Sequence, residues 1–162
     1  MAILARRFLI TAGLVGSVLA LAGCDKLVPG SAADGKAFKA IDITGADYAK
    51  VLSLADADGR VRTLADFQGK VVVVFFGYVQ CPDVCPTTLA ELAAVKRELG
   101  AEGARVQGIF VTVDPERDTA AVLKDYVAQF DPGFVALRGT PEETQATAKE
   151  FKIFFSKVPG KT

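Results

Sequence analysis

The chain has 162 residues, of which 51% are hydrophobic and 23% are charged, a composition that suits one domain with a buried core and excludes a chain disordered by composition. The 19 basic and 19 acidic residues balance, so the sequence lacks the electrostatic footprint of a nucleic-acid-binding protein, and no nucleic acid is expected as a partner. Because the chain contains no histidine, it excludes histidine bases, histidine-ligated zinc and histidine-containing triads, and leaves three cysteines and the carboxylates for chemistry.

The first 23 residues have the features of a secretion signal. Arg6 and Arg7 precede an apolar run over 8–23, which is short for a membrane span of roughly 20 residues. The run ends in Leu-Ala-Gly before Cys24, which resembles the lipobox of bacterial lipoproteins. We therefore expect residues 1–23 to be a lipoprotein signal peptide and Cys24 to carry a lipid anchor on the periplasmic side of the bacterial inner membrane. An uncleaved N-terminal membrane helix is the alternative.

Residues 24–47 are rich in Gly, Ala and Asp and show no clear periodicity. Such a composition predicts a flexible tether that spaces a domain, here residues 48–162, from the membrane. Because the domain is expected outside the cytoplasm, a disulfide between its cysteines could persist. With Cys24 assigned to the anchor, Cys81 and Cys85 remain for chemistry.

The domain is expected to open with a β-hairpin, whose strands over 51–55 and 60–64 are joined by the turn sequence Asp-Ala-Asp-Gly. A continuous β-branched and aromatic run over 70–78 predicts a strand buried on both faces, as in a parallel sheet. Leucines and valines then recur at helical spacing, which predicts a helix that begins at Pro86 and stops at Gly100.

The second half of the domain continues the alternation of strands and helices. We expect a buried strand over 105–113, a helix over 119–130, a short strand over 134–137 and a helix that begins at Pro141 and ends near Lys152. This order predicts an α/β domain with a central, mostly parallel sheet flanked by helices. Several doubly wound folds share that order, so the order alone does not select one of them.

Two cysteines lie where the strand over 70–78 turns into the following helix. Three residues separate Cys81 from Cys85, so the two sulfurs can converge on one small volume. The helix N-terminus carries about half a positive charge, which stabilises a thiolate and lowers the pKa of a thiol. Two thiolates can bind a soft metal such as Cu(I), or they can form a disulfide and exchange with other thiols. A structural disulfide or two buried apolar thiols is the alternative.

Two motifs make the sequence resemble the Sco/SenC family. The run FFGYVQCPDVCPTTL over 75–89 resembles the family signature around its cysteines, and VDPERDT over 113–119 resembles the second signature. The similarity covers roughly residues 50–159. It implies a thioredoxin-like fold and a protein that delivers copper to the copper-site subunit of cytochrome c oxidase. Other periplasmic copper chaperones are further candidate partners.

The resemblance also implies roles for single residues. Copper in the family lies on the two motif cysteines and a histidine, so Cys81 and Cys85 are the expected metal ligands. Asp114 and Asp118 match acidic positions near the family site, with turn formation as the alternative for Asp114. Because Asp118 precedes a helix, we expect it to cap that helix rather than to serve the site. Asp83 is expected either to tune the site or to shape its turn.

The sequence departs from the family in its last part. The family histidine lies in an Asp-His segment beyond the Ser-Lys-Val-Pro stretch of residues 156–159, and this chain contains no histidine. The closing strands and final helix of the family are missing too, so we expect a domain that is incomplete at its C-terminus, either as a fragment or as a short protein. Two sulfurs suffice for Cu(I), whereas Cu(II) should bind poorly without N/O-rich ligands.

Three functions would use the same two cysteines. The favoured one is a membrane-anchored copper metallochaperone, which is a carrier and not an enzyme. The second is a thiol–disulfide oxidoreductase that reduces the oxidase's copper-site cysteines, with Cys81 and Cys85 as catalytic residues. The third is a redox or copper sensor. A reductase turns over dithiol substrate without metal, whereas a chaperone transfers copper stoichiometrically, so the first two can be separated by experiment.

Overall fold

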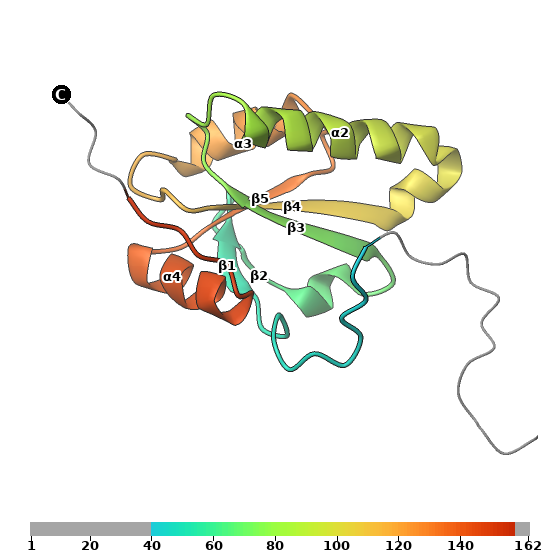
Figure 1. The fold of residues 1–162 in the computed structure, drawn as a ribbon. Helices are drawn as coiled ribbons and strands as arrows, with labels where there is room; N and C mark the ends of the chain where they lie inside the picture. Colours follow the sequence, from blue (N-terminus) through green and yellow to red (C-terminus); the bar gives the residue numbers. More distant parts are fainter. Residues whose placement is uncertain (1–39, 158–162) are drawn as a thin grey trace, which may run out of the picture. The chain divides into compact units, whose positions relative to one another are not determined.

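The computed structural model describes residues 40–157 (Figure 1). The predicted signal peptide, Cys24 and most of the predicted tether lie outside the described residues, and those assignments stay predictions. Residues 40–52 contain no helix or strand. Within residues 40–157, no helix is both long and apolar enough to cross a membrane. All helices and strands of the described residues belong to a unit that begins at Thr44.

A five-stranded sheet in the order β2-β1-β5-β4-β3 forms the centre of this unit. Its strands are β1 Ser53–Asp56, β2 Val61–Thr63, β3 Val71–Gly77, β4 Val106–Thr112 and β5 Val135–Arg138. The strands β3, β4 and β5 run parallel, as predicted, whereas β1 is antiparallel to both β2 and β5. The sheet is therefore mixed: a parallel half that carries the cysteines, and the predicted hairpin along its other edge.

Helices cover both faces of the sheet (Figure 1). The helices α2, Val84–Glu98, and α3, Ala120–Ala128, lie over one face, and α4, Pro141–Glu150, lies over the other. Two short 3₁₀ helices were not predicted, η1 at Leu64–Phe67 and η2 at Gly100–Arg105. The α/β fold class predicted from the order of elements is confirmed.

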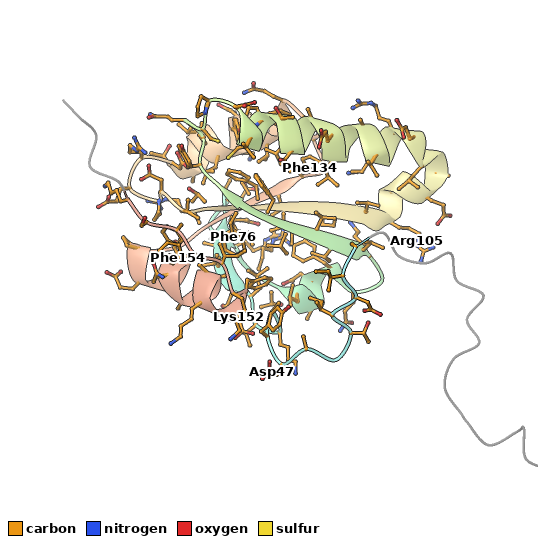
Figure 2. The ribbon with its side chains drawn as sticks, in the orientation of Figure 1. Asp47, Phe76, Arg105, Phe134, Lys152 and Phe154 are labelled. Carbon is orange, nitrogen blue, oxygen red and sulfur yellow. The ribbon has the colours of Figure 1, made fainter. Side chains whose placement is uncertain are left out.

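The core is divided by the sheet into two clusters, because side chains along a strand point alternately to its two faces. In β4, Phe110 packs under α2 and α3, and its neighbours Ile109 and Val111 pack on the α4 side. Phe134 belongs to the first cluster and Phe76 packs against the second, and they lie on opposite sides of the sheet in Figure 2. Residues 107–112 are all buried, as expected for a central strand.

The prediction that the first long strand is buried on both faces is wrong for most of β3. Residues 72–76 are only half-buried and Val71 is exposed, while Gly77 alone is buried. The reason is the position of β3, which pairs with β4 on one side and forms the edge of the sheet within residues 40–157. The composition of an apolar run predicts that a strand is buried. It does not show how many neighbouring strands cover that strand.

The helix starts follow local capping chemistry. Thr140 and Glu143 form a capping box around Pro141, so α4 begins where the sequence predicts. By contrast, α2 begins at Val84, two residues before the predicted start at Pro86. A proline fits the first turn because the first four N–H groups of a helix have no intrahelical partner. This shift puts Cys85 inside the helix.

Gly108 of β4 packs closely against Phe134, which precedes β5, and Leu92 of α2. A Cβ atom at Gly108 would lie 2.6 Å from two ring atoms of Phe134 and 3.1 Å from Cδ2 of Leu92. The Gly108→Ala variant should therefore lose about 1–3 kcal/mol of unfolding free energy, measured by urea denaturation. Adding Phe134→Leu to it should recover part of that loss, because the smaller side chain removes the clash. Full stability of the single variant would contradict this packing.

Candidate metal and thiol site

The two cysteines meet at the N-terminus of α2. The loop between β3 and α2 is closed by a hydrogen bond of 3.2 Å from the Cys81 amide to the Tyr78 carbonyl. The Cys85 amide donates to Sγ of Cys81 at 3.4 Å, so the sulfur of Cys81 lies over the first turn of the helix. Both thiols are free; Cys81 is half-buried and Cys85 is only 5% exposed. The structure brings the pair together as the spacing predicts.

The two thiols differ in acidity because their surroundings differ. Burial acts to raise the pKa of Cys81, but hydrogen bonds from the Cys85 thiol and from backbone amides of residues 83–85 outweigh it, and the pKa is lowered. Burial raises the pKa of Cys85 to about 11, and the charges of Cys81 and Asp118 act in the same direction. Cys81 is thus the more accessible and more acidic thiol, and Cys85 is the buried and less acidic one.

Alkylation with iodoacetamide should separate the two thiols. The rate at Cys81 should rise with pH and reach half of its maximum below the ordinary thiol pKa, because only the thiolate reacts and its pKa is lowered. Cys85 should stay unmodified until the pH approaches 11, since both burial and its raised pKa protect it. Peptide mass spectrometry at each pH gives both rates. Equal rates at the two positions would rule out this asymmetry.

Gly77 leaves the space that the buried sulfur occupies. A Cβ atom at this position would lie 2.9 Å from Sγ of Cys85 and 2.9 Å from Cε2 of Phe110. The last residue of β3 therefore has to be small for Cys85 to point into the core. The Phe-Phe-Gly sequence that ends the strand was visible beforehand, but its role at the site was not predicted.

Asp118 does not cap α3, and that prediction is wrong. The N-cap of α3 is Thr119, whose side chain accepts a hydrogen bond from the Val122 amide. Asp118 is 2% exposed, and its Oδ2 accepts hydrogen bonds from Oγ1 of Thr112 at 2.6 Å and from the Val79 amide at 3.1 Å. Its carboxylate joins the end of β4 to the loop that carries the cysteines. Sequence position alone favours capping, since a residue before a helix usually caps it.

Asp114 reaches the cysteine loop only through a neighbour. It forms an ion pair with Arg117, whose Nη1 donates to Oε1 of Gln80 at 3.1 Å, next to Cys81. Asp83 is exposed and occupies the N-cap position of α2, but its side chain makes no capping hydrogen bond. Arg117 and Gln80 were not predicted as site residues, although Arg117 lies in the motif over 113–119 and Gln80 in the motif over 75–89.

Tyr126 is a further polar group near the thiols that the sequence did not single out. Its ring packs against Phe110 and Phe130, and its hydroxyl is buried without a hydrogen-bond partner among the described residues. Burial raises the pKa of Tyr126 to about 12, and the charges of Cys85, Cys81 and Asp118 add to that rise. The phenol is therefore neutral at physiological pH and presents no charge to the site.

The donors available for a metal are the two sulfurs. Among residues 40–157, no group of three or more His, Cys, Asp or Glu side chains lies close enough to hold a metal ion. Soft thiolate ligands select soft metals such as Cu(I), which accepts low coordination numbers. The site therefore combines a two-sulfur donor set with an accessible, acidified thiol.

A family model described as SCO1/SenC matches residues 42–162. The chain belongs to the SCO1/SenC family. The mitochondrial SCO2 homolog of Bos taurus is 43% identical over 109 residues, which are 66% of this chain and 41% of the bovine protein. The chain thus spans less than half the length of that relative. The family fold is thioredoxin-like, and this chain shares it.

Two solved structures of relatives connect this fold with copper in one protein and with cytochrome c oxidase assembly in the other. Copper-bound ScoI of Bradyrhizobium japonicum matches with a TM-score of 0.64 and 41% identity over 69% of this chain and 71% of ScoI. BsSco, described as a member of the Sco family of cytochrome c oxidase assembly proteins with a disulfide switch, matches with a TM-score of 0.57 and 27% identity, covering 68% of this chain and 67% of BsSco.

Proposed function

We propose that this SCO1/SenC chain is a copper metallochaperone for the copper site of cytochrome c oxidase, with Cu(I) as its cargo on Cys81 and Cys85. The observation that carries the proposal is the pair of free sulfurs at the N-terminus of α2, where backbone amides stabilise the Cys81 thiolate. The copper-bound ScoI relative and the oxidase-assembly relative BsSco support it.

The site suits a carrier that releases its metal. Two thiolates bind Cu(I) because both partners are soft, and a low coordination number leaves room for sulfurs of a recipient. Cys81 is half-exposed, so an incoming thiol can approach the metal from its side, while the buried Cys85 keeps it attached. Cu(II) should bind poorly, because no Asp or Glu of the described residues joins the two sulfurs in a group that could hold a metal ion.

A thiol–disulfide oxidoreductase is the second candidate, and the asymmetry of the thiols favours it. An accessible thiolate beside a buried, protonated thiol is the arrangement of an attacking and a resolving cysteine. In that reaction, the Cys81 thiolate attacks a disulfide of the recipient and releases one recipient thiolate, and Cys85 then attacks the Cys81 sulfur of the mixed disulfide and releases the second. The recipient gains two thiols, and this chain ends with a Cys81–Cys85 disulfide. A separate reductant would then have to restore the two thiols.

We also propose that a lipid on Cys24 tethers the chain to the periplasmic side of the inner membrane. The support is the sequence alone, namely the apolar run over 8–23 and the Leu-Ala-Gly-Cys stretch that ends at Cys24. Globomycin, which blocks lipoprotein signal cleavage, should make the uncleaved precursor accumulate in cells. An unchanged mass in treated cells would favour an ordinary signal or an uncleaved helix.

The experiment that separates the two candidate functions uses the full chain and the soluble copper-site domain of the oxidase. The Cu(I)-loaded chain should transfer about one copper per molecule to the reduced, metal-free domain without turnover. In the absence of metal, the same chain with excess dithiol should not reduce the oxidised domain catalytically. Catalytic reduction together with failed copper transfer would replace the chaperone by the oxidoreductase.

A further inference from the structure

Tyr126 of α3 carries a polar group that the metal-free fold does not use. The helices α2 and α3 lie over the same face of the sheet (Figure 1), and the ring of Tyr126 packs against the core cluster beneath them. Its hydroxyl is buried and has no hydrogen-bond partner in the described part of the chain. A buried hydroxyl without a partner costs stability, and phenylalanine would fill the same space without that cost. The oxygen therefore calls for a role outside the metal-free fold.

The phenol of Tyr126 and the sulfur of Cys85 share a neighbour, the ring of Phe110. The rings of Phe110 and Tyr126 have centroids 5.6 Å apart. A Cβ atom at Gly77 would lie 2.9 Å from both Sγ of Cys85 and Cε2 of Phe110, so the sulfur and the ring flank the same point. Burial raises the pKa of Tyr126 to about 12, and among the charges that add to this rise, that of Cys85 has the largest effect. Because charge effects weaken with distance, the phenol lies in the surroundings of the buried sulfur.

Cys85 needs a stabilising partner when it binds a metal, because a thiol ligates Cu(I) as the thiolate. Cys85 is 5% exposed, so water contributes little to stabilising that charge. Burial, the hydrogen bond with Cys81 and the charge of Asp118 raise the pKa of Cys85, while a hydrogen bond from the Tyr78 amide lowers it. A further neutral donor beside the sulfur would therefore favour the metal-bound state.

The Tyr126 hydroxyl can meet this need only once the thiolate has formed. In the metal-free chain the Cys85 thiol donates to Cys81, and a neutral thiol sulfur is a weak acceptor. A hydrogen bond to a charged acceptor is roughly twice as strong as one between neutral groups. With a pKa of about 12, the phenol keeps its proton near neutral pH and can donate a hydrogen bond. The loaded chain thus offers an acceptor that the free chain lacks.

We propose that Tyr126 is a positioning residue for the bound copper, whose hydroxyl donates a hydrogen bond to the Cys85 thiolate when Cu(I) occupies the two sulfurs. This role rests on the proposed function and adds a residue outside the motifs over 75–89 and 113–119. The thiol proton of Cys85 passes to solvent as the Cu–S bond forms, and the phenol keeps its own proton. Loss of that thiol proton also breaks the hydrogen bond to Cys81, which frees the Cys85 sulfur to approach the phenol.

The test compares the full chain with Tyr126→Phe, which removes only the phenol oxygen. Anaerobic titration against a Cu(I) chelator should show that this variant binds Cu(I) about tenfold more weakly, because one hydrogen bond to a charged group is lost. Tyr48→Phe is the matched control, since it removes the same atom from a ring that Nζ of Lys152 covers at 5.9 Å, beyond the end of α4. Its Cu(I) affinity should equal that of the unchanged chain.

Two further measurements separate positioning from a structural role. The metal-free Tyr126→Phe variant should unfold in urea at the same or a higher midpoint than the unchanged chain, because the hydroxyl that it loses has no partner. With tyrosine labelled at 13Cζ, the chain gives NMR signals from three tyrosines, and Tyr126→Phe identifies the signal of Tyr126. That signal should move when Cu(I) binds, and the signal of Tyr48 should not.

The outcomes distinguish this role from the function on which it rests. Equal Cu(I) affinity of Tyr126→Phe and the unchanged chain, or a Tyr126 signal that stays in place, would overturn the role and leave the proposed function standing. A fall in metal-free stability as large as the fall in affinity would make the hydroxyl a structural group and would overturn the role as well. If the unchanged chain binds no Cu(I), the proposed function fails and the role of Tyr126 fails with it.

Discussion

The Cys81→Ser variant is expected to lose its high affinity for Cu(I), by at least about a hundredfold, because loss of even an outer-shell group at a metal site typically costs 10–100-fold. Serine offers a hard hydroxyl that stays protonated at neutral pH, so only the buried sulfur of Cys85 would remain as a soft ligand. Titration under anaerobic conditions against a colorimetric Cu(I) chelator measures the affinity.

The third cysteine provides the matched control for this titration. Cys24→Ser makes the same substitution at the cysteine assigned to the lipid anchor, and in chain produced without lipidation it should leave both the affinity and the stoichiometry unchanged. The stability of Cys81→Ser should change little, because Cys81 is half-exposed and belongs to neither core cluster. Tight binding of one Cu(I) by Cys81→Ser would show that its sulfur is not a ligand and would remove the basis of the proposed function.

The Asp118→Ala variant is expected to be destabilised by about 3 kcal/mol or more, because hydrogen bonds to a charged group contribute about 1.5–3 kcal/mol each and buried donors left unpaired add a further cost. The substitution leaves the buried Thr112 hydroxyl and the partly buried Val79 amide without their hydrogen-bond acceptor. Urea denaturation should show a lower midpoint. Asp118→Asn, which keeps the shape and one carbonyl oxygen, should lose less.

Asp125→Ala is the control for Asp118→Ala, since Asp125 is exposed on α3 and should tolerate truncation. A second effect should appear at the thiols. Because Asp118 holds the backbone at Val79, its loss should loosen the cysteine loop and raise the rate at which Cys85 is alkylated. Equal stability of Asp118→Ala and Asp125→Ala would mean that the carboxylate is not the anchor of the loop.

The parts of the fold that local patterns specify could be predicted from the sequence. Alternation and a turn sequence predict the β1–β2 hairpin, and long apolar runs predict β3 and β4, because strand formation follows from short-range composition. Pro141 marks the start of α4 for the same reason. The approach of Cys81 to Cys85 also follows from a spacing of four residues at a helix start.

The features that depend on tertiary neighbours could not be predicted in this way. The edge position of β3 follows from the strand order, and no single segment of the sequence determines that order. Asp118 has the sequence context of a helix cap, and only the folded chain shows that Thr112 and Val79 surround it.

The pairing of β1 with β5 imposes an order on folding. Ala55 pairs with Arg138, and Asp56 with Leu137, so the inner strand of the N-terminal hairpin finds its neighbour only when the chain has been made as far as residue 138. As the chain emerges from the ribosome or a translocation channel, the hairpin comes out before β5, and the edge of β1 that pairs with β5 stays unpaired until then. Such long-range closure slows folding. The N-terminal hairpin is therefore the segment that a chaperone or a protease would find exposed for longest during biogenesis.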